Sequence, residues 1–196
     1  MTSHDVPALV PARTALLAMD FQNGIVPIAP EPEALLARVR EAAARVRAAG
    51  GTVAHVRVAF TEEDWAAASE RNRSFGAVAA NRALHHLDEA TQFHPGLAPL
   101  EGDIVVRKVR IGAGSTTDLY ERLAARGVDT LVLSGISTSG VVLSTLLDAA
   151  DRDYRLYVLS DGVAARDPEV HRVLLEKVFP SRAHVIDTAR LAELLG

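Results

Sequence analysis

The feature that most constrains the fold is a regular alternation of short β-rich apolar runs with longer segments of helical periodicity. The first run, residues 14–21 (TALLAMDF), is almost continuously apolar, which is typical of a strand buried on both faces. Residues 32–49 follow with apolar side chains at every third or fourth position and stop at Gly50 and Gly51, as in an amphipathic helix. Further strands are predicted at residues 52–60, 103–107, 130–136, 154–160 and 183–187, and further helices at 116–126, 139–150, 168–178 and 188–195.

Six strands alternating with helices predict a single α/β domain over residues 1–196. Short strand–helix–strand connections are right-handed, so the strands should form an open parallel sheet with helices on both faces, a three-layer α-β-α, Rossmann-like architecture. Active sites of such sheets lie where the carboxyl ends of the strands meet. Residues 61–102 interrupt the alternation and are predicted to form a lid or a partner-facing insert.

Composition excludes several classes of protein. The chain has no cysteine, which rules out disulfides, cysteine-ligated metals and a thiol nucleophile. A net charge of −4 leaves no electrostatic footprint for nucleic acid or an anionic membrane. The longest uncharged stretch, residues 130–147, has a strand-like half and a helix-like half, and the N-terminal residues lack a signal-peptide pattern. We therefore expect a cytoplasmic protein that acts on a small molecule and binds neither nucleic acid nor membrane.

Motifs for nucleotide cofactors and metals are missing from the sequence. Gly112 and Gly114 lack the third glycine of a dinucleotide-binding loop, and no lysine follows Gly140 as a phosphate-binding loop requires. No H-x-x-x-H or D-x-H pattern occurs, and the adjacent His85 and His86 would point to different sides of a helix. We expect no cofactor and no metal. Three acidic residues are interpreted as solvated turn residues: Asp5, Asp88 and Asp103.

Asp20 and Lys108 are the best candidates for catalysis. Asp20 closes the first strand, where a buried carboxylate is costly unless it is paired. Lys108, one of only two lysines among 21 basic residues, closes the third strand and supplies a counter-charge that would tune the carboxylate for proton transfer. The helix near Ser139 would aim free backbone N–H groups at the same place. A purely structural ion pair explains the two residues equally well.

A serine hydrolase is a weaker alternative. Ser137 lies between a strand and a helix, as a nucleophile elbow would, and Ser137, Asp161 and His184 follow the chain order of α/β-hydrolases. Ser139 replaces the closing glycine of the G-x-S-x-G motif, and hydroxyl groups at this position also serve as helix N-caps.

Residues 14–187 resemble the isochorismatase-like hydrolase family, which includes isochorismatases, nicotinamidases and N-carbamoylsarcosine amidases. The resemblance lies in three segments: TALLAMDFQNGIV, DIVVRKVRIGAGSTTDL and TLVLSGISTSGVVLSTLLDAADRDYRLYVLSDG. It implies a six-stranded parallel sheet, a homo-oligomer (dimer or tetramer), an Asp–Lys–Cys triad and a non-proline cis peptide. By this resemblance Asp20 and Lys108 are the family's acid/base and lysine, and the cis bond joins Ile136 to Ser137. The metal motif of nicotinamidases is absent.

The family's cysteine falls on Val141, and this difference decides the expected mechanism. Valine cannot be a nucleophile, so a covalent thioester route is excluded. Isochorismatases proper also lack the cysteine. In them the Asp protonates the vinyl carbon of an enol ether and water adds without a covalent enzyme intermediate. The resemblance therefore implies a metal-independent hydrolase of a small, anionic enol ether. A catalytically inactive relative that serves as a small-ligand-binding or assembly module is the alternative.

In the leading hypothesis, Asp20 is the general acid and base, and Lys108 orients and charge-balances it. The backbone amides of Gly140 and Val141, in the turn that starts at Ile136 and Ser137, would hold developing negative charge. The insert would close the site through its residues 61–82. Substrate-pocket candidates are Gln22, Trp65, Arg73, Phe75 and Ser139.

Overall fold

The computed structural model describes residues 6–196, so Asp5 lies outside the described residues. All six predicted strands are present: β1 Thr14–Met19, β2 Thr52–Val58, β3 Ile104–Lys108, β4 Thr130–Ile136, β5 Arg155–Ala164 and β6 His184–Ile186. The α-helices are α1 Pro32–Ala48, α2 Glu62–Ala66, α3 Phe75–Ala80, α4 Leu119–Ala124, α5 Leu143–Ala150, α6 Pro168–Val173 and α7 Thr188–Leu195.

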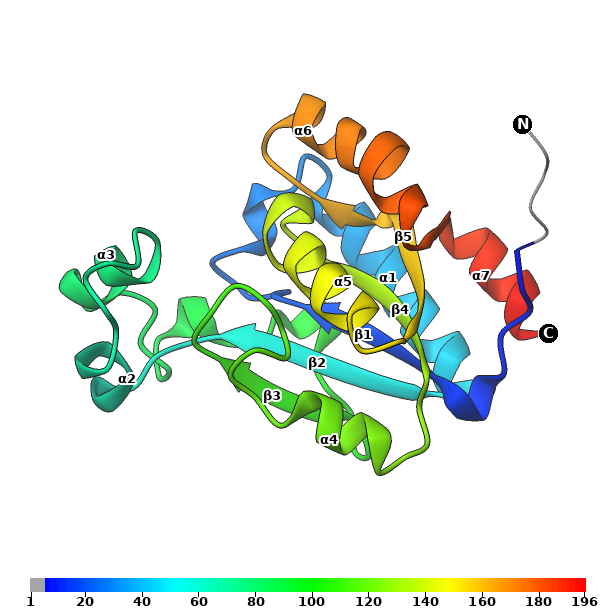
Figure 1. Cartoon of the computed structure of the whole chain (residues 1–196), viewed down its shortest axis with the longest axis horizontal. Coiled ribbons are helices and arrows are strands. Elements are labelled where there is room, and N and C mark those ends of the chain that lie inside the picture. Colours follow the sequence, from blue (N-terminus) through cyan, green and yellow to red (C-terminus); the bar gives the residue numbers. More distant parts are fainter. Residues whose placement is uncertain (1–5) are drawn as a thin grey trace.

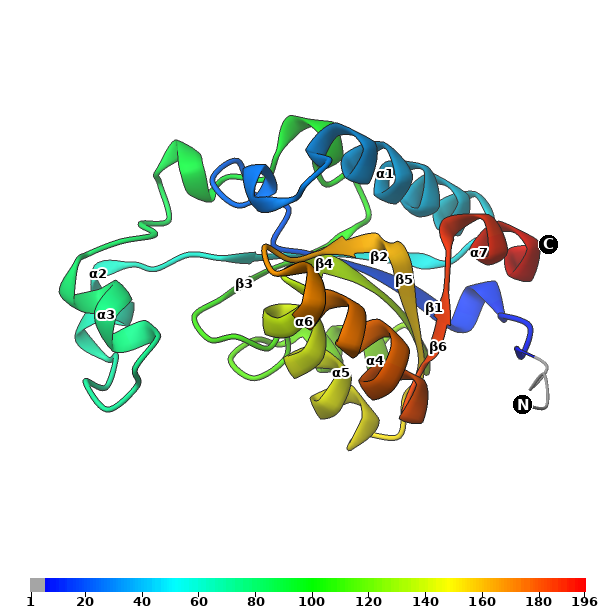
Figure 2. The ribbon, with the colours of Figure 1, turned by 90° about the horizontal axis from the view of Figure 1, so that it is seen from above.

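The strands form one six-stranded parallel sheet in the order β3-β2-β1-β4-β5-β6. Figure 2 shows α1 and α7 on one face of the sheet and α4, α5 and α6 on the other. The predicted three-layer α-β-α architecture is thus confirmed. The order also places β1 and β4 side by side at the centre. The chain adds β2 and β3 on one side of β1 and then β4, β5 and β6 on the other, and ligand sites of open parallel sheets form at such a switch point.

The core explains why β1 reads as an unbroken apolar run. All six of its residues are buried, because helices cover both sheet faces at this central position. Leu17 and Met19 pack in the cluster under α4 and α5, whereas Leu16 packs in the cluster under α1 and α7. The alternation of faces along β1 sets the direction in which the chain leaves the strand at Asp20.

Two predicted helices are irregular at their ends. The segment predicted as a helix over 139–150 begins with a π-helical turn, Thr138–Val142, before α5 starts. The segment predicted over 168–178 likewise ends in a π-helical turn, Leu174–Val178. Hydrophobic periodicity does not distinguish i→i+4 from i→i+5 hydrogen bonding over a single turn, and such turns occur often at functional sites.

Asp103 is not a solvated turn residue, and that interpretation is wrong. Its carboxylate is buried at the start of β3, where it accepts two hydrogen bonds from Arg47, at 3.0 and 2.6 Å, and one from the backbone N–H of Leu100. It also lies 3.1 Å from Nε2 of the buried His55. These partners hold the pKa of Asp103 below its usual value despite burial, and burial lowers the pKa of His55. The cluster ties α1 to two strands at the sheet edge remote from Asp20.

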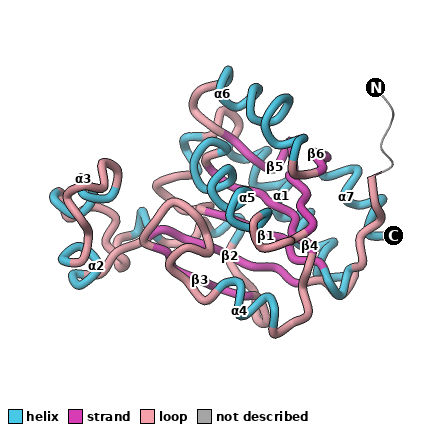
Figure 3. Tube along the Cα trace, in the orientation of Figure 1, coloured by secondary structure: helices cyan, strands magenta, loops and turns pink. Residues whose placement is uncertain are grey.

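The first part of the insert at residues 61–102, up to His85 and His86, forms an arm that projects beyond the sheet and does not cover it. Its two short helices, α2 and α3, stand out beyond the carboxyl end of β2 (Figure 1), and the chain between them is loop (Figure 3). Figure 2 shows the same projection from a second direction. At its root the arm has a small apolar cluster in which Phe75 packs on Phe60 at 5.8 Å between ring centroids. None of the helices formed by residues 6–196 has the length and apolar character of a membrane span.

Candidate active site

Asp20 and Lys108 form a buried ion pair across the carboxyl ends of three strands. Asp20 follows β1 with a positive φ of 62°, a backbone conformation that Asp and Asn tolerate better than most residues. Lys108 ends β3, and its side chain crosses the end of the intervening β2 to place Nζ 2.8 Å from Oδ2 of Asp20. Both side chains are almost inaccessible to solvent, at 6% for Asp20 and 3% for Lys108. The pairing predicted from strand ends is therefore present.

The lysine is fully engaged, whereas the aspartate is not. Nζ also donates hydrogen bonds to the carbonyl oxygens of Arg110 and Ile111, at 3.2 and 2.9 Å, so its three protons all have acceptors. Asp20 Oδ1, in contrast, is buried and has no hydrogen-bond partner among the described residues. A buried carboxylate oxygen without a partner is unfavourable in a purely structural ion pair. Oδ1 is therefore the carboxylate oxygen that lacks a partner among the described residues.

Burial raises the pKa of Asp20 from 3.8 to about 6, although Lys108 opposes the shift by its charge and its hydrogen bond. Desolvation disfavours the charged carboxylate, and the lysine only partly compensates for it. Both protonation states are therefore accessible near neutral pH. A general acid and base works best when its pKa lies near the working pH.

The turn after β4 contains the cis peptide expected between Ile136 and Ser137. Ser137 then caps the π-helical turn, because its Oγ and its carbonyl oxygen each accept from the N–H of Gly140 at 3.1 Å. The Gly140 amide is thus engaged in this structure and not free to bind an oxyanion, contrary to the expectation for it. The Val141 amide alone stays a predicted donor to developing negative charge.

Val141 lies on the side of the turn that faces the sheet. Its side chain is 2% exposed and packs in the cluster with Leu17 and Met19. A Cβ at Gly135 would lie 3.4 Å from Val141 Cγ1 and 2.8 Å from the carbonyl oxygen of Met19, so only glycine fits between the turn and β1. The valine therefore fills a tightly packed position at the end of the two central strands.

The residues of the serine-hydrolase alternative do not converge. The Asp161 carboxylate accepts hydrogen bonds from the N–H and Oγ1 of Thr188, at 3.0 and 2.7 Å. His184 begins β6 and is paired in register with Tyr157, which is itself paired with Val132. Ser137 lies five residues beyond Val132, on the order of 15 Å farther along the strand direction. The hydroxyl of Ser137 serves as the helix cap that was the other interpretation of this cluster.

Of the substrate-pocket candidates, Gln22 does not face an open pocket, so that expectation is wrong. Its side chain is fully buried, and Nε2 donates to the carbonyl oxygens of Val58 and Thr91 at 3.0 and 2.8 Å, while Oε1 accepts from the N–H of Val58 at 2.8 Å. With every polar group satisfied by backbone, Gln22 joins the end of β2 to the returning insert. Ser139 is exposed on the π-helical turn.

The arm candidates lie outside the immediate surroundings of Asp20. Trp65 donates from Nε1 to the carbonyl oxygen of Ala83 at 3.0 Å, and Phe75 belongs to the apolar cluster at the arm's root. Arg73 is exposed. In this structure Trp65 and Phe75 stabilise the arm, Arg73 is exposed on it, and none of the three covers the ion pair.

Sequence reasoning missed Arg110 and the link between Thr138 and His171. The guanidinium of Arg110 lies 5.8 Å over the ring of Phe75, and its carbonyl oxygen receives Lys108 Nζ, so it connects the ion pair to the arm. Thr138 Oγ1 lies 2.8 Å from Nδ1 of His171, which joins the turn to α6. The sequence feature that could have indicated Arg110 was its position two residues after Lys108. No local pattern pairs Thr138 with a residue 33 positions away.

A cavity of about 550 Å³ lies next to His171, on the side of the turn where β5 and α6 meet. Its polar lining includes Arg38, Asp161 and Arg166, and neither Asp20 nor Lys108 contributes to it. Arg38 Nε donates to the carbonyl oxygen of Asp161 at 2.8 Å. The cavity is therefore separate from the buried ion pair.

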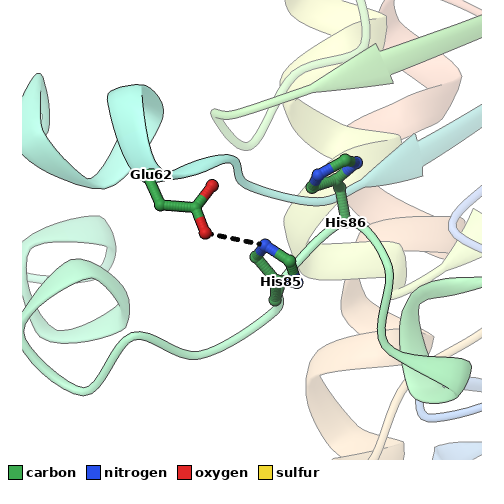
Figure 4. Close-up of side chains that lie close together, drawn as sticks. All are labelled: Glu62, His85 and His86. Carbon is green, nitrogen blue, oxygen red and sulfur yellow. Dashed lines mark ion pairs between the residues drawn. The ribbon is translucent and has the colours of Figure 1, made fainter.

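His85 and His86 also differ from expectation, because they do not lie on a helix. His85 forms an isolated β-bridge with Phe60, and both histidines approach Glu62 of α2 (Figure 4). One ligand atom from each of these three residues lies within 4.8 Å of the others. Neither the spacing of the histidines nor their distance in sequence from Glu62 predicts this cluster.

Comparison with known proteins identifies relatives over almost the whole chain. Residues 14–190 match the model of the isochorismatase domain. The chain is 35% identical to YecD of Escherichia coli O157:H7, an uncharacterized isochorismatase family protein, over 88% of this chain and 90% of YecD. It is 31% identical to the phenazine biosynthesis protein PhzD of Pseudomonas fluorescens, over 95% of this chain and 91% of PhzD. An isochorismatase family protein from Burkholderia thailandensis, 30% identical, superposes with a TM-score of 0.84 over 97% of this chain and 99% of that protein.

Proposed function

This chain belongs to the isochorismatase family of hydrolases, and we propose that it hydrolyses a small, anionic enol ether with Asp20 as general acid and base. The observation that carries the proposal is the asymmetry of the Asp20 carboxylate. Oδ2 is held 2.8 Å from Lys108, whereas Oδ1 is buried without a partner. Because the chain has no cysteine, a covalent thiol route has no nucleophile, and direct proton transfer is the chemistry that these residues support.

The reaction starts from the neutral carboxyl group of Asp20, which the raised pKa keeps populated near pH 6. Oδ1 gives its proton to the terminal vinyl carbon, and the π electrons of the C=C bond form the new C–H bond. The other vinyl carbon becomes an oxocarbenium ion, stabilised by a lone pair of the ether oxygen. The Asp20 carboxylate that remains is charge-balanced by Lys108 and lies next to the developing cation.

Water then adds to the oxocarbenium carbon, and its proton returns to Asp20. The hemiketal carbon then breaks its bond to the ether oxygen and becomes a ketone. The proton that its hydroxyl group gives up is taken by the ether oxygen, which leaves as the alcohol. One water molecule is consumed and Asp20 is regenerated in its neutral form. No covalent bond to the enzyme forms at any step.

Two groups on the segments that follow β3 and β4 suit the negative charge of the substrate. Among residues 6–196, the half-buried guanidinium of Arg110 donates from Nη1 to the carbonyl oxygen of Val109, and its other N–H groups could bind a carboxylate. The Val141 amide, at the start of the helix after β4, is our second assignment. Arg73 of the arm stays a candidate that would need the arm to move.

The decisive experiment measures turnover of isochorismate, with pyruvate release as the readout, by wild-type protein and by the Asp20→Asn variant. Asn tolerates the positive φ at this position, so the variant should fold. Far-UV circular dichroism would check its fold. Loss of general acid catalysis should lower kcat by about 10²–10⁴-fold. The matched control is Asp88→Asn, which changes an exposed carboxylate and should leave the rate unchanged.

Two results would contradict the proposal. If the wild-type protein turns over neither isochorismate nor related enol ethers, enol-ether hydrolysis is not its reaction. An Asp20→Asn variant with a near-normal rate would remove the role of Asp20.

A ligand-binding or assembly module without catalysis is the second candidate, favoured by the buried valine at the family's nucleophile position. It predicts that small carboxylates raise the melting temperature of the wild-type protein although no enol ether, amide or ester is turned over. Amidase activity gained by a Val141→Cys variant would support an intact pocket. The serine-hydrolase alternative predicts labelling by a fluorophosphonate, which we do not expect because Ser137 acts as a helix cap.

The proposal also includes predictions of the oligomeric state, the location, nucleic-acid binding and the need for a cofactor. We expect a homo-oligomer, a dimer or tetramer, which light scattering after size-exclusion chromatography would measure. We expect a cytoplasmic location and no affinity for nucleic acid, given the net charge of −4. We also expect turnover without a metal or other cofactor, which treatment with a chelator before the assay would test.

A further inference from the structure

We propose that Glu62, His85 and His86 form a binding site for a divalent transition-metal ion, best matched by zinc, at the root of the arm. Two imidazoles and one carboxylate are the ligand types that zinc accepts together. One ligand atom from each residue lies within 4.8 Å of the other two, and the three side chains face one another in Figure 4. This site is separate from Asp20 and Lys108 and does not depend on the proposed reaction.

The distance between His85 and Glu62 fits a tetrahedral ion. Zinc bonds to nitrogen and carboxylate oxygen are about 2.0–2.2 Å long, so two ligands of a tetrahedral site lie roughly 3.3 Å apart. Nε2 of His85 and Oε1 of Glu62 are 3.3 Å apart, which already matches one edge of the tetrahedron. Glu62 is 59% exposed on the first turn of α2, so its side chain can adjust toward the two imidazoles.

The second observation that points to a ligand is the state of His85. Its side chain is only 21% exposed, and Nε2 is buried without a hydrogen bond in the described part of the chain, although the Glu62 carboxylate lies beside it. A buried ring nitrogen that faces a carboxylate and lacks a well-directed hydrogen bond is unfavourable. A cation between the two groups satisfies both.

The backbone around both histidines is firmly held, as a metal site requires. The N–H of His86 donates to the carbonyl oxygen of Phe60 at 2.8 Å, and the carbonyl oxygen of His85 accepts from Thr91 Oγ1 at 2.7 Å. The ring of Trp65 lies 5.3 Å from the ring of His85 and restricts its rotation. Such supporting contacts orient metal ligands and raise their affinity.

The backbone of Glu62 is held by the start of α2, although its side chain is exposed. Thr61 and Asp64 form a capping box, in which the N–H of Thr61 donates to Asp64 Oδ2 and the N–H of Asp64 donates to Thr61 Oγ1. Asp64 is further paired with Arg107, and Arg57 Nη1 donates to the carbonyl oxygen of His86 at 3.3 Å, so both guanidinium groups have acceptors other than Glu62. Glu63 adds a second exposed carboxylate beside Glu62.

The bound ion would join the two ends of the arm. Glu62 lies where the chain enters the arm, and His85 and His86 lie where it returns to the sheet. Such an ion binds the folded chain, in which the three ligands lie together, and not the unfolded one. Metal binding should therefore raise the melting temperature and protect the arm, whose exposed Arg71 and Arg73 are trypsin sites.

The test is titration of metal-free protein with Zn²⁺ by calorimetry, and with Co²⁺ by the visible absorption of a tetrahedral centre. We expect one ion per chain. Glu62→Gln and His86→Ala should each weaken binding by about tenfold or more, as changes around metal sites do. Glu62→Gln is the key variant, because an exposed side chain can be changed without threatening the fold. The matched controls are Glu70→Gln and His94→Ala, which should bind Zn²⁺ like the wild type.

Three outcomes would overturn the proposal. The first is no uptake of either ion by the wild-type protein. The second is uptake that Glu62→Gln and His86→Ala leave unchanged, which would place the ion elsewhere. The third is equal trypsin cleavage of the arm with and without Zn²⁺ together with an unchanged melting temperature. None of these readouts depends on hydrolase activity.

Discussion

Replacing Lys108 with methionine should lower stability strongly, because the substitution leaves the Asp20 carboxylate buried without its counter-charge. Methionine keeps the length of the side chain and adds no polar group, so packing at the end of β3 changes little. Removing one partner of a buried ion pair costs about 3–5 kcal/mol. For a chain of this length that corresponds to a fall in melting temperature of roughly 6–20 °C.

The deficit of the Lys108→Met variant should grow with pH. Burial raises the pKa of Asp20 to about 6 while Lys108 holds it down, so removing the lysine raises it further. A carboxyl group whose folded-state pKa is raised adds stability that is fully present below its unfolded pKa near 3.8 and is lost as pH rises through the folded pKa. In the wild type this loss ends near pH 6. In the variant it continues above pH 6, at up to about 1.4 kcal/mol per pH unit.

Urea unfolding followed by far-UV circular dichroism at pH 5, 6, 7 and 8 measures both effects. The Asp20→Asn/Lys108→Met double variant has no buried charge at this place, and we expect it to recover about 2 kcal/mol relative to Lys108→Met at pH 8. Lys177→Met replaces the protein's other lysine, which is exposed, and should change stability by less than about 0.5 kcal/mol.

The reasoning is refuted if Lys108→Met loses no more stability than Lys177→Met. It is also refuted if the deficit is the same at pH 5 and pH 8, or if the double variant is less stable than Lys108→Met at pH 8. Any of these results would mean that the carboxylate is effectively solvated or that the pair is not formed.

Three further predictions follow from particular contacts. Gly135→Ala should cost about 1–3 kcal/mol in urea unfolding, since its Cβ would lie 2.8 Å from the carbonyl oxygen of Met19; an unchanged midpoint would show that β1 and the turn can separate. Asp103→Ala should cost about 3 kcal/mol, because it leaves a guanidinium and a buried imidazole without their acceptor, and a loss under 1 kcal/mol would speak against a shared cluster. The kcat/KM for an enol ether should fall as pH rises above about 6, where Asp20 loses the proton it must donate; a rate that rises with pH instead would assign Asp20 as a base only.

The sequence is sufficient to predict both the sheet and the ion pair between Asp20 and Lys108, and the same reason explains both. Strand ends follow from where apolar runs stop, and parallel topology brings those ends to one edge, so Asp20 and Lys108 must meet. The helix irregularity at Thr138 is different, because one π-helical turn leaves the apolar periodicity of its helix intact.

The contacts that sequence reasoning missed are long-range and involve irregular backbone. Gln22 was expected in a pocket, yet it bonds to Thr91, 69 residues away, and only the path of the returning insert creates that partner. The same path brings His85 to Glu62. Asp103 looked like a turn residue because its partner Arg47 lies on a helix 56 positions earlier. Local pattern carries no information about such pairs.

The placement of Lys108 on an edge strand has a consequence for exchange between open and closed states of the sheet. β3 pairs with only one neighbour, β2, and edge strands open more readily than central ones. Each such opening withdraws the ammonium group from Asp20 and leaves the carboxyl group without its partner. Hydrogen exchange of the Val106 amide, in the middle of β3, would therefore report the fraction of molecules in which the pair is assembled at any moment. We expect the opening of this one peripheral strand to set the share of molecules in which the pair is assembled.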